Sequence, residues 1–220
     1  QFAPGLWEKG TLHFVPDFRT PLISPRLAGM ARNIYAPSAV ERPEGGWRVF
    51  YGGWDGVPSM NDRIYSVDTD DFLDFTDRHM VIDHGVMEHV CNVNALALPG
   101  GGWAMVCTAL PKDRNYPVFF TSPDGKTWNG DTQPHQAQMK DLVPIEGYAN
   151  FSQADINGMN VILYENGGYR LYFGDFKQFG HVYTAHSKDG KKFQYEGAAL
   201  DAPLMVNDVK KLSAGGAAWY

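Results

Sequence analysis

Several kinds of feature are missing from this sequence of 220 residues. No apolar run reaches the roughly 18 residues that a membrane-spanning helix needs, so no membrane span is predicted. No apolar pattern with a period of 3.6 residues extends far enough to predict a substantial helix. The net charge is −6 and basic residues form no cluster, which argues against nucleic acid and phosphate-bearing ligands as partners.

Sequence motifs of the common catalytic and metal sites are also absent. The chain has no H-E-x-x-H, no G-x-S-x-G, no phosphate-binding loop and no zinc-spaced cysteine pair. No cofactor and no metal is therefore predicted, and a structural Ca²⁺ stays open as an alternative that no ligand run supports. No signal peptide is visible, but the unusual start at Gln1 suggests a processed end, so a secreted or periplasmic location is favoured.

Cysteine is scarce, with only Cys91 and Cys107 present. If residues 92–98 pair with 103–110 as a hairpin in which Leu98 faces Trp103, Cys107 lies opposite Asn94 and Cys91 opposite Leu110. The sulfurs then lie roughly 10 Å apart, because a strand rises about 3.3 Å per residue. A disulfide needs Cα atoms within about 7 Å, so we predict two free, buried thiols.

What the sequence does contain is a turn motif that occurs three times. Residues 122–128 (SPDGKTW) match 187–193 (SKDGKKF) position for position, and 69–75 (TDDFLDF) is a looser copy. Each copy has a hydroxyl residue, an aspartate two residues later and an aromatic residue four residues after that. Asp-Gly favours a tight turn, because glycine adopts positive φ freely and aspartate hydrogen-bonds to nearby backbone.

The turn motif ends a longer repeat of strands. An aromatic-rich strand that follows a Gly-Gly pair precedes each copy, at 47–54 (WRVFYGGW), 103–110 (WAMVCTAL) and 169–176 (YRLYFGDF). One strand before the glycines, one before the turn and one after it complete a four-stranded antiparallel unit. A repeat of that kind is typical of a β-propeller blade. We therefore predict an all-β propeller as a single domain, with the turn motif's aromatic residue packed where neighbouring blades meet.

Complete blades are predicted near 34–86, 90–145 and 154–203, with partial blades at 1–33, including a strand at 11–18, and at 206–220. Two explanations compete for the partial blades. The N-terminal strands complete the last blade of a four-bladed ring, or the chain is a piece of a longer five-bladed propeller. The second is favoured, because Trp219-Tyr220 resembles the opening of another aromatic-rich strand.

In a propeller, the starts of the innermost strands and the loops after the second strands open at the same end. The polar residues predicted at that end are carboxylates and amides next to aromatic rings, a composition that suits sugars. Glycoside hydrolysis needs two carboxyl groups across the scissile bond. The predicted catalytic residues are Asp155 and Asp208, with Glu88 as the next choice. The predicted substrate-binding residues are Trp54, Asp55, His89, Asn92, Asn94, Arg32, Arg63 and Asp175. Each carboxylate could instead be a turn cap or a solvated loop residue.

The segments YAPSAV, WRVFYGGW and RIYSVDTDDFLDF together resemble a blade of the five-bladed propeller glycoside hydrolases, such as families 32, 43, 62, 117 and 130. This resemblance covers most of the chain and implies glycosidase activity on an oligo- or polysaccharide. One departure concerns Ala36-Pro37-Ser38. Family 43 commonly has an aspartate where this chain has Ser38, so the carboxylate that tunes the pKa in that family is missing at this position.

Two other functions remain open. A non-catalytic, lectin-like propeller would bind glycans through the same end of the fold. A sialidase-like enzyme would fit the turn motif, but the arginine triad expected for a carboxylate-bearing sugar is not apparent. A pair of carboxylates facing an open site would favour hydrolysis, whereas one carboxylate with several aromatic rings would favour binding.

Overall fold

The computed structural model describes residues 5–6, 9, 18–19, 22–23, 33–54, 61–130, 133–149, 151–157, 160–201 and 205–220. Strands dominate these ranges, and the 3-10 helix η1 (Met139–Asp141) has three residues. The predicted all-β class is confirmed. None of the helices in the described residues is long and apolar enough to cross a membrane.

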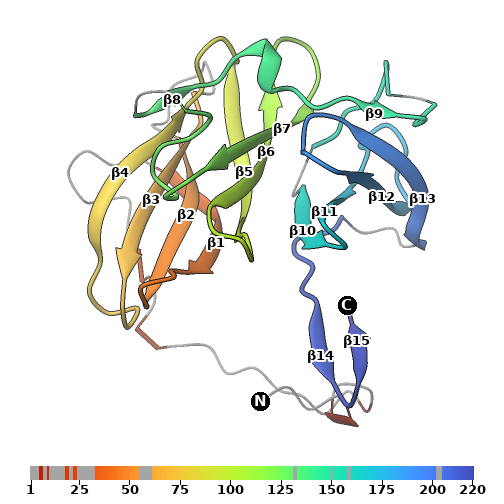
Figure 1. Cartoon of the computed structure of the whole chain (residues 1–220). Helices are drawn as coiled ribbons and strands as arrows, with labels where there is room; N and C mark the ends of the chain where they lie inside the picture. The colour runs from red at the N-terminus through yellow and green to blue at the C-terminus, as the bar shows by residue number, and fades with distance from the viewer. Residues whose placement is uncertain are drawn as a thin grey trace.

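The strands form three sheets and a hairpin (Figure 1). The first sheet contains β1 (Asn33–Glu41), β2 (Trp47–Trp54), β3 (Arg63–Thr69) and β4 (Thr76–Asp83), with β8 (His135–Gln136) beside β4. The second contains β5 (His89–Ala97), β6 (Trp103–Leu110) and β7 (Tyr116–Ser122). The third contains β10 (Val161–Glu165), β11 (Gly168–Phe173), β12 (His181–Ser187) and β13 (Phe193–Asp201), with β9 (Ile145–Glu146) beside β13. The hairpin joins β14 (Leu212–Ala214) to β15 (Ala217–Trp219).

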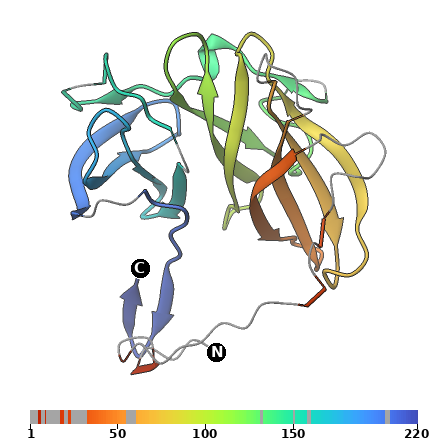
Figure 2. The same cartoon turned by 180° about the vertical axis from the view of Figure 1, so that it is seen from behind.

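The second sheet lies between the other two and is buried on both faces. Alternate side chains of β6 point to opposite faces, as in any strand. Trp103 and Met105 belong to the core shared with the first sheet, whereas Ala104 and Val106 belong to the core shared with the third. Because both faces are covered, every residue of β6 is buried. The two cores therefore stack the sheets in sequence order, as Figures 1 and 2 show from opposite sides.

The turn motif is built as the sequence predicts. The Ser122 hydroxyl accepts backbone hydrogen bonds from Asp124 at 3.3 Å and Gly125 at 2.8 Å. One Asp124 carboxylate oxygen accepts two more, from Lys126 at 2.8 Å and Thr127 at 2.7 Å. Gly125 has a φ of +72°, and a Cβ there would lie 2.9 Å from the Trp103 ring. Glycine is thus required both by the backbone conformation and by the packing of the ring.

The aromatic residue of the motif packs between neighbouring sheets. Trp128 is buried with its ring edge-on to Phe50 of the first sheet, at a centroid distance of 5.7 Å. Phe193 meets Phe119 of the second sheet in the same way, at 6.2 Å. The predicted role of this residue is confirmed at both interfaces.

Among the described residues of the predicted blade 90–145, the second sheet has three strands rather than the four that the sequence predicted. Asn129 closes the edge of β7 by donating its backbone N–H to Thr121 O and accepting the Thr121 N–H on its side chain, at 2.8 and 3.0 Å. The chain then leaves the sheet, and β8 and β9 pair in parallel with β4 and β13 of the neighbouring sheets. Between them, the chain returns to β7 only at an isolated bridge from Leu142 to Val118. A buried pair, His135 with Asp141 at 2.9 Å, anchors this crossing segment. The prediction of four-stranded units holds for the first and third sheets only.

Both cysteines are free and buried, as predicted. Burial is the largest cause that raises the pKa of each thiol. The predicted register was wrong by one residue, because Ala97 rather than Leu98 lies opposite Trp103. Leu98 instead closes the hairpin loop by donating its N–H to Gly102 O at 2.9 Å. A bulge then shifts the register again between Cys91 and Asn94.

The hairpin of β14 and β15 stands off the three sheets in Figures 1 and 2. It is tied to the end of β10 through Glu165, which accepts hydrogen bonds from Lys211 and Tyr220, each at 3.0 Å. The strand predicted from residue 206 begins only at Leu212. Of the strand predicted at 11–18, only Phe18 lies within the described residues.

Candidate functional site

A row of polar side chains crosses one end of the three sheets. Its members, here called the polar row, are Asp62, His89, Asn115, Asp155 and Asp175. Backbone hydrogen bonds join the row, from Val90 N to Asp62 O at 3.0 Å and from Ile156 N to Asn115 O at 3.1 Å. The loop after the second strand of one sheet thus contacts the first strand of the next sheet, or the segment just before that strand. This is the convergence that the sequence predicted.

Asp155 is the carboxylate of the polar row that is oriented through one oxygen only. Its Oδ1 accepts two hydrogen bonds from Asn115, one from the backbone N–H at 3.0 Å and one from the side-chain amide at 2.8 Å. Its side chain is half-buried, and no described group is hydrogen-bonded to Oδ2. One oxygen therefore fixes the orientation of the carboxylate, and the other has no hydrogen-bond partner among the described residues.

Asp175 supports Asp155 from behind. Its Oδ1 accepts the backbone N–H groups of Asp155 at 3.0 Å and Lys177 at 2.8 Å, and its Oδ2 accepts the Tyr148 hydroxyl at 2.9 Å. Burial raises the pKa of Tyr148, and the hydrogen bond to Asp175 raises it further, so the phenol stays a donor. Asp175 is 1% exposed, and its oxygens are engaged within the protein.

His89 links the two halves of the row. Its Nε2 lies 3.0 Å from Asn115 Oδ1, and its Nδ1 lies 3.9 Å from Asp62 Oδ2. Because the Asn115 amide donates to Asp155, its oxygen faces His89, and Nε2 must carry a proton. On the far side of His89, Asp62 accepts a hydrogen bond from the Tyr35 hydroxyl. Burial raises the pKa of Tyr35, as do the neighbouring Cys91 and Asp62.

The other two predicted catalytic residues lie outside the row. Glu88 is exposed beside His89, and its backbone N–H donates to Leu110 O at 2.7 Å. Asp208 is also exposed, accepts the Asn94 amide at 3.3 Å and pairs with Lys210 at 3.1 Å. Asp208 is thus attached to Asn94 of β5, whereas Asp155 is attached to Asn115 before β7.

Asn94 has a structural contact that the sequence did not suggest. Its Oδ1 accepts the backbone N–H of Ile162 in the third sheet at 3.1 Å. Ser38 does the same one sheet earlier, where its hydroxyl accepts the N–H of Ala95 at 3.0 Å. Both residues follow a bulge in the first strand of their sheets. The serine of Ala36-Pro37-Ser38 thus joins two sheets at the place where family 43 commonly has a carboxylate.

The remaining predicted binding residues have varied surroundings. Arg63 begins β3 and pairs with Asp83 at 2.8 Å, so its guanidinium is engaged within the first sheet. Asn92 lies in the bulge of β5 with a φ of +53°, and Trp54 is half-buried at the end of β2. Arg32 and Asp55 lie outside the described residues.

Sequence reasoning missed the roles of Asp62, Asn115 and Tyr148. The sequence does contain a signal for Asp62 and Asn115, because each stands directly before the third strand of its sheet. Tyr148 offers no such signal, since it lies in the segment between β9 and β10.

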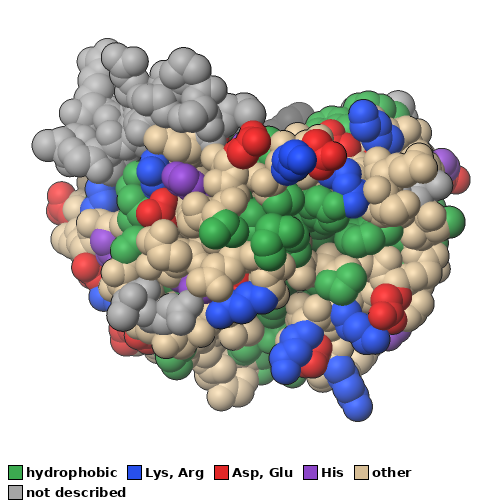
Figure 3. Space-filling model, turned by 90° about the horizontal axis from the view of Figure 1, so that it is seen from above, with side chains coloured by type: hydrophobic (Ala, Val, Ile, Leu, Met, Phe, Trp, Pro, Cys, Tyr) green, Lys and Arg blue, Asp and Glu red, His purple; other side chains and the backbone are tan. Residues whose placement is uncertain are grey.

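The chemistry of the polar row is that of a site for uncharged polar ligands. Carboxylate, amide and imidazole groups offer both donors and acceptors to hydroxyl groups. Among the described residues, no group of three or more His, Cys, Asp and Glu side chains could hold a metal ion. Seen from above the sheets, apolar side chains gather across the middle of the face with charged groups around them (Figure 3).

Comparisons with known proteins place the fold. No protein-family model and no curated protein sequence matches the chain. Among solved structures, a glycoside hydrolase family 130 protein, described as targeting β-1,2 mannosidic linkages in Candida mannan, is 18% identical with a TM-score of 0.60. The match covers 86% of this chain and 59% of that one.

Two other structures are similar. A glycosyl hydrolase from Bacteroides ovatus is 19% identical over 82% of this chain and 57% of that one, with a TM-score of 0.58. A family 117 glycoside hydrolase from the marine bacterium Zobellia galactanivorans is 15% identical over 74% of this chain and 55% of that one, with a TM-score of 0.57. The chain thus spans well under two thirds of the length of these proteins, and it shares its fold with glycoside hydrolases.

Proposed function

We propose that this chain is part of a glycoside hydrolase that cleaves an oligo- or polysaccharide at the polar row. The observation that carries this proposal is the geometry of Asp155, whose Oδ1 is held by two Asn115 donors while Oδ2 has no described partner. An oriented carboxylate of this kind suits a nucleophile or a general base. The fold shared with glycoside hydrolases of low identity supports the same class of reaction by analogy.

The second carboxylate is proposed from three residues. Asp62 ranks first, because it belongs to the row and one of its oxygens faces His89. Glu88 ranks next, since it is exposed directly beside His89. Asp208 ranks third, because it is attached to Asn94 further along β5 and carries an ion pair with Lys210.

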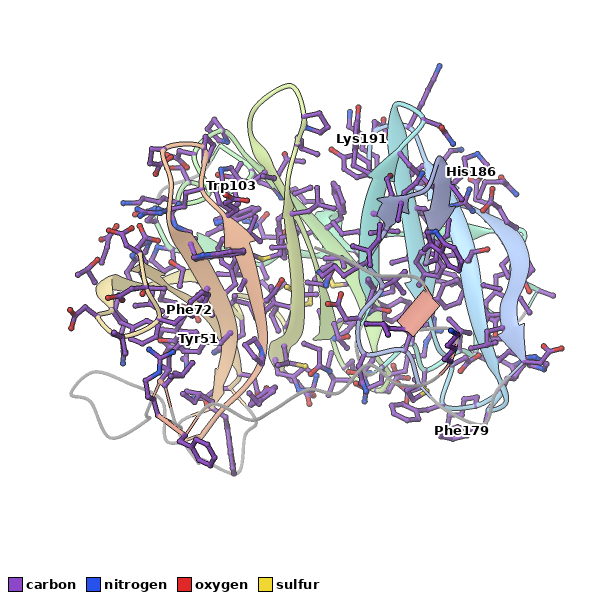
Figure 4. The ribbon with its side chains drawn as sticks, turned by 90° about the horizontal axis from the view of Figure 1, so that it is seen from below. Tyr51, Phe72, Trp103, Phe179, His186 and Lys191 are labelled. Atoms are coloured by element: carbon purple, nitrogen blue, oxygen red, sulfur yellow. The ribbon has the colours of Figure 1, made fainter. Side chains whose placement is uncertain are left out.

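The proposed architecture is a propeller, five-bladed and completed by further chain. Its support comes from matching positions on the second strands. Met105 and Cys107 of β6 pack against the preceding sheet, and Val49 and Tyr51 of β2 occupy the corresponding positions. Tyr51 lies on the side of the first sheet that faces away from the second, as does Phe72 (Figure 4). That apolar face is suited to a preceding blade.

The experiment is a panel of glycosides assayed with the protein and its carboxylate variants. Release of reducing sugar or of an aryl leaving group is expected from at least one substrate. Asp155→Asn and one of Asp62→Asn, Glu88→Gln and Asp208→Asn should each lower kcat by about 10²- to 10⁴-fold, the usual range for lost proton-transfer catalysis. Full activity of Asp155→Asn would overturn the assignment.

A binding function without catalysis is the second candidate, and one observation favours it. The polar row contains only one carboxylate, Asp155, with an oxygen that has no described partner, and aromatic pairs begin directly after its partner Asn115 and directly after Asp175. A protein of this kind would bind glycans and release no product from any of them. Absence of turnover together with measurable glycan binding would decide for this function.

A further inference from the structure

Two pairs of aromatic side chains are carried by segments that contact Asp155 or the residues bonded to it. Tyr116 and Phe151 form the first pair, with ring centroids 5.9 Å apart, and Phe176 and Phe179 form the second, 5.3 Å apart. The first three rings are half-buried, and Phe179 is 62% exposed. Figure 4 shows Phe179 at the outer edge of the third sheet.

The first pair is joined to the row through the chain, and the second through the chain and a hydrogen bond. Tyr116 directly follows Asn115, which holds the Asp155 carboxylate. Phe176 directly follows Asp175, and its N–H donates to the backbone oxygen of Asp155 at 2.9 Å. One pair is therefore attached to the donor side of Asp155 and the other to its supporting side.

The first pair is held in place by Arg114. The guanidinium lies over the Tyr116 ring, 4.2 Å from its centroid. It also donates to Phe151 O at 2.6 Å and to Ala154 O at 3.2 Å, directly before Asp155. The ring pair and the carboxylate are thus positioned by the same side chain, and the rings lose little freedom when a ligand binds.

A groove continues outward from the first pair. It has a volume of about 510 Å³ and is lined by Tyr116 and Phe151 together with Pro111 and Met139. Lys112 and Asp113 are exposed at its rim, where they offer a donor and an acceptor. Rings that take the CH face of a sugar, with charged groups beside them for its hydroxyls, fit carbohydrate better than a wholly apolar partner.

We propose that the two aromatic pairs bind sugar units on either side of Asp155, so that the ligand is a carbohydrate chain that extends through the site in both directions. A monosaccharide derivative would reach only one of the pairs. This inference rests on the proposed function for the chemical class of the ligand. It adds that the chain length of the substrate is recognised.

The test is electrophoresis in native gels that contain yeast mannan, inulin or arabinoxylan, followed by isothermal titration with oligosaccharides of two to six units from the polysaccharide that retards the protein. Phe179→Ala should weaken binding of the longest oligosaccharide by about three- to tenfold, the effect of one lost ring contact. Tyr116→Ala should do the same, with thermal melting used to verify that it folds. The shortest oligosaccharide should be affected less than the longest.

Tyr220→Ala is the matched control, because Tyr220 is also 62% exposed but lies after the β14–β15 hairpin. It should bind like the unmodified protein. Retardation by none of the three polysaccharides, or unchanged binding by Phe179→Ala, would overturn the inference. Hydrolysis of a short glycoside with ring-insensitive binding would sink the inference and leave the proposed hydrolase standing. Binding that depends on the rings, without hydrolysis of any substrate, would support the inference and overturn the proposed hydrolase.

Discussion

The aspartates at the two ends of the sheets are chemically identical and have different surroundings. Asp62 precedes β3 and Asp71 follows it. Asp71 accepts the backbone N–H groups of Leu73 and Asp74 within its own turn, at 2.8 and 3.0 Å, and these bonds lower its pKa. Asp62 instead faces Tyr35 and His89 from two other strands. At one end, aspartate stabilises a local turn, and at the other it joins elements that are distant in sequence.

The range of an aspartate's contacts distinguishes a residue of local structure from a residue of the candidate site. A turn aspartate uses its oxygens on neighbours within four residues, so a short motif is enough to identify it. A row aspartate has partners on other sheets, as Asp155 has in Asn115, 40 residues earlier. We expect substitutions at the turn end to change stability and substitutions in the row to change ligand binding or catalysis.

The largest expected loss of stability comes from Arg48, which connects the turn end of two sheets. This 3% exposed residue donates twice to Asp68, at 2.7 and 2.8 Å, and once to Asp124 O at 2.8 Å. Arg48→Ala removes both short hydrogen bonds of a buried carboxylate and leaves it only the 3.4 Å contact with Arg42, so it should lower the free energy of unfolding by about 3–5 kcal/mol. Urea denaturation measures it.

Arg42→Ala is the control for Arg48→Ala. Arg42 contacts the same Asp68 at 3.4 Å, but its main partner, Asp70, is exposed. The expected loss is at most about 1 kcal/mol. Equal losses of unfolding free energy in the two variants would show that the buried Arg48–Asp68 pair stabilises the protein no more than the exposed Arg42 pair.

A smaller loss is expected at the supporting side of the row. Tyr148→Phe removes the hydroxyl that donates to buried Asp175 at 2.9 Å. It should cost about 1–3 kcal/mol of stability, the range for a buried acceptor that loses its donor, and should also lower kcat because Asp175 orients Asp155. Tyr169→Phe, another buried tyrosine, should leave kcat unchanged. If Tyr148→Phe leaves kcat unchanged, Asp175 does not contribute to catalysis through Asp155.

At the turn end, Asp124→Ala should cost about 1 kcal/mol, the usual value of a lost cap, without any change in activity. Burial alone would raise the pKa of Asp124, but hydrogen bonds from Thr127 and Lys126 outweigh it and lower the pKa. Asp74→Ala, an exposed residue of the first turn, should stay within about 0.5 kcal/mol of the unmodified protein. Thermal melting of both variants gives the comparison.

The smallest expected effect depends on pH and concerns the hairpin. Hydrogen bonds from Arg170, Lys211 and Tyr220 lower the pKa of Glu165 from 4.5 to about 2, against the effect of burial. Since the folded protein holds this proton less tightly, the stabilisation is present above pH 4.5 and is lost as the pH falls toward 2. The gap in melting temperature between the protein and Glu165→Gln should therefore shrink over this interval. A difference in melting temperature that stays constant over this pH interval would contradict the role of Glu165.

The sequence predicted those parts of the fold that repeat locally. The bounds of β2 and β6 match the predicted 47–54 and 103–110, because Gly-Gly pairs and aromatic residues mark both strands. The fate of residues 133–146 was not predictable, since β8 and β9 pair with strands of the neighbouring sheets. The register of β5 was missed first at the hairpin, because Leu98 belongs to the turn, and again at the bulge between Cys91 and Asn94.

The candidate site was predicted in part for the same reason. Asp155, His89 and Asp175 are members of the row that the sequence named; His89 begins β5 and Asp175 follows β11, whereas Asp155 lies six residues before β10. Asn115 and Asp62 were not singled out, because their importance comes from contacts across sheets. Asp208 was paired with Asp155 by analogy of position, but Asp208 contacts Asn94 of β5 and Asp155 contacts Asn115 before β7.

One measurement tests the division between the two ends most directly. Asp155→Asn and Asp124→Asn are compared for hydrolysis of the best substrate and for melting temperature in the same preparation. The account predicts that Asp155→Asn loses hydrolysis while it melts close to the unmodified protein, and that Asp124→Asn keeps kcat/KM while it melts lower. Full hydrolysis by Asp155→Asn, or its loss in Asp124→Asn, would contradict the assignment of the site to the polar row.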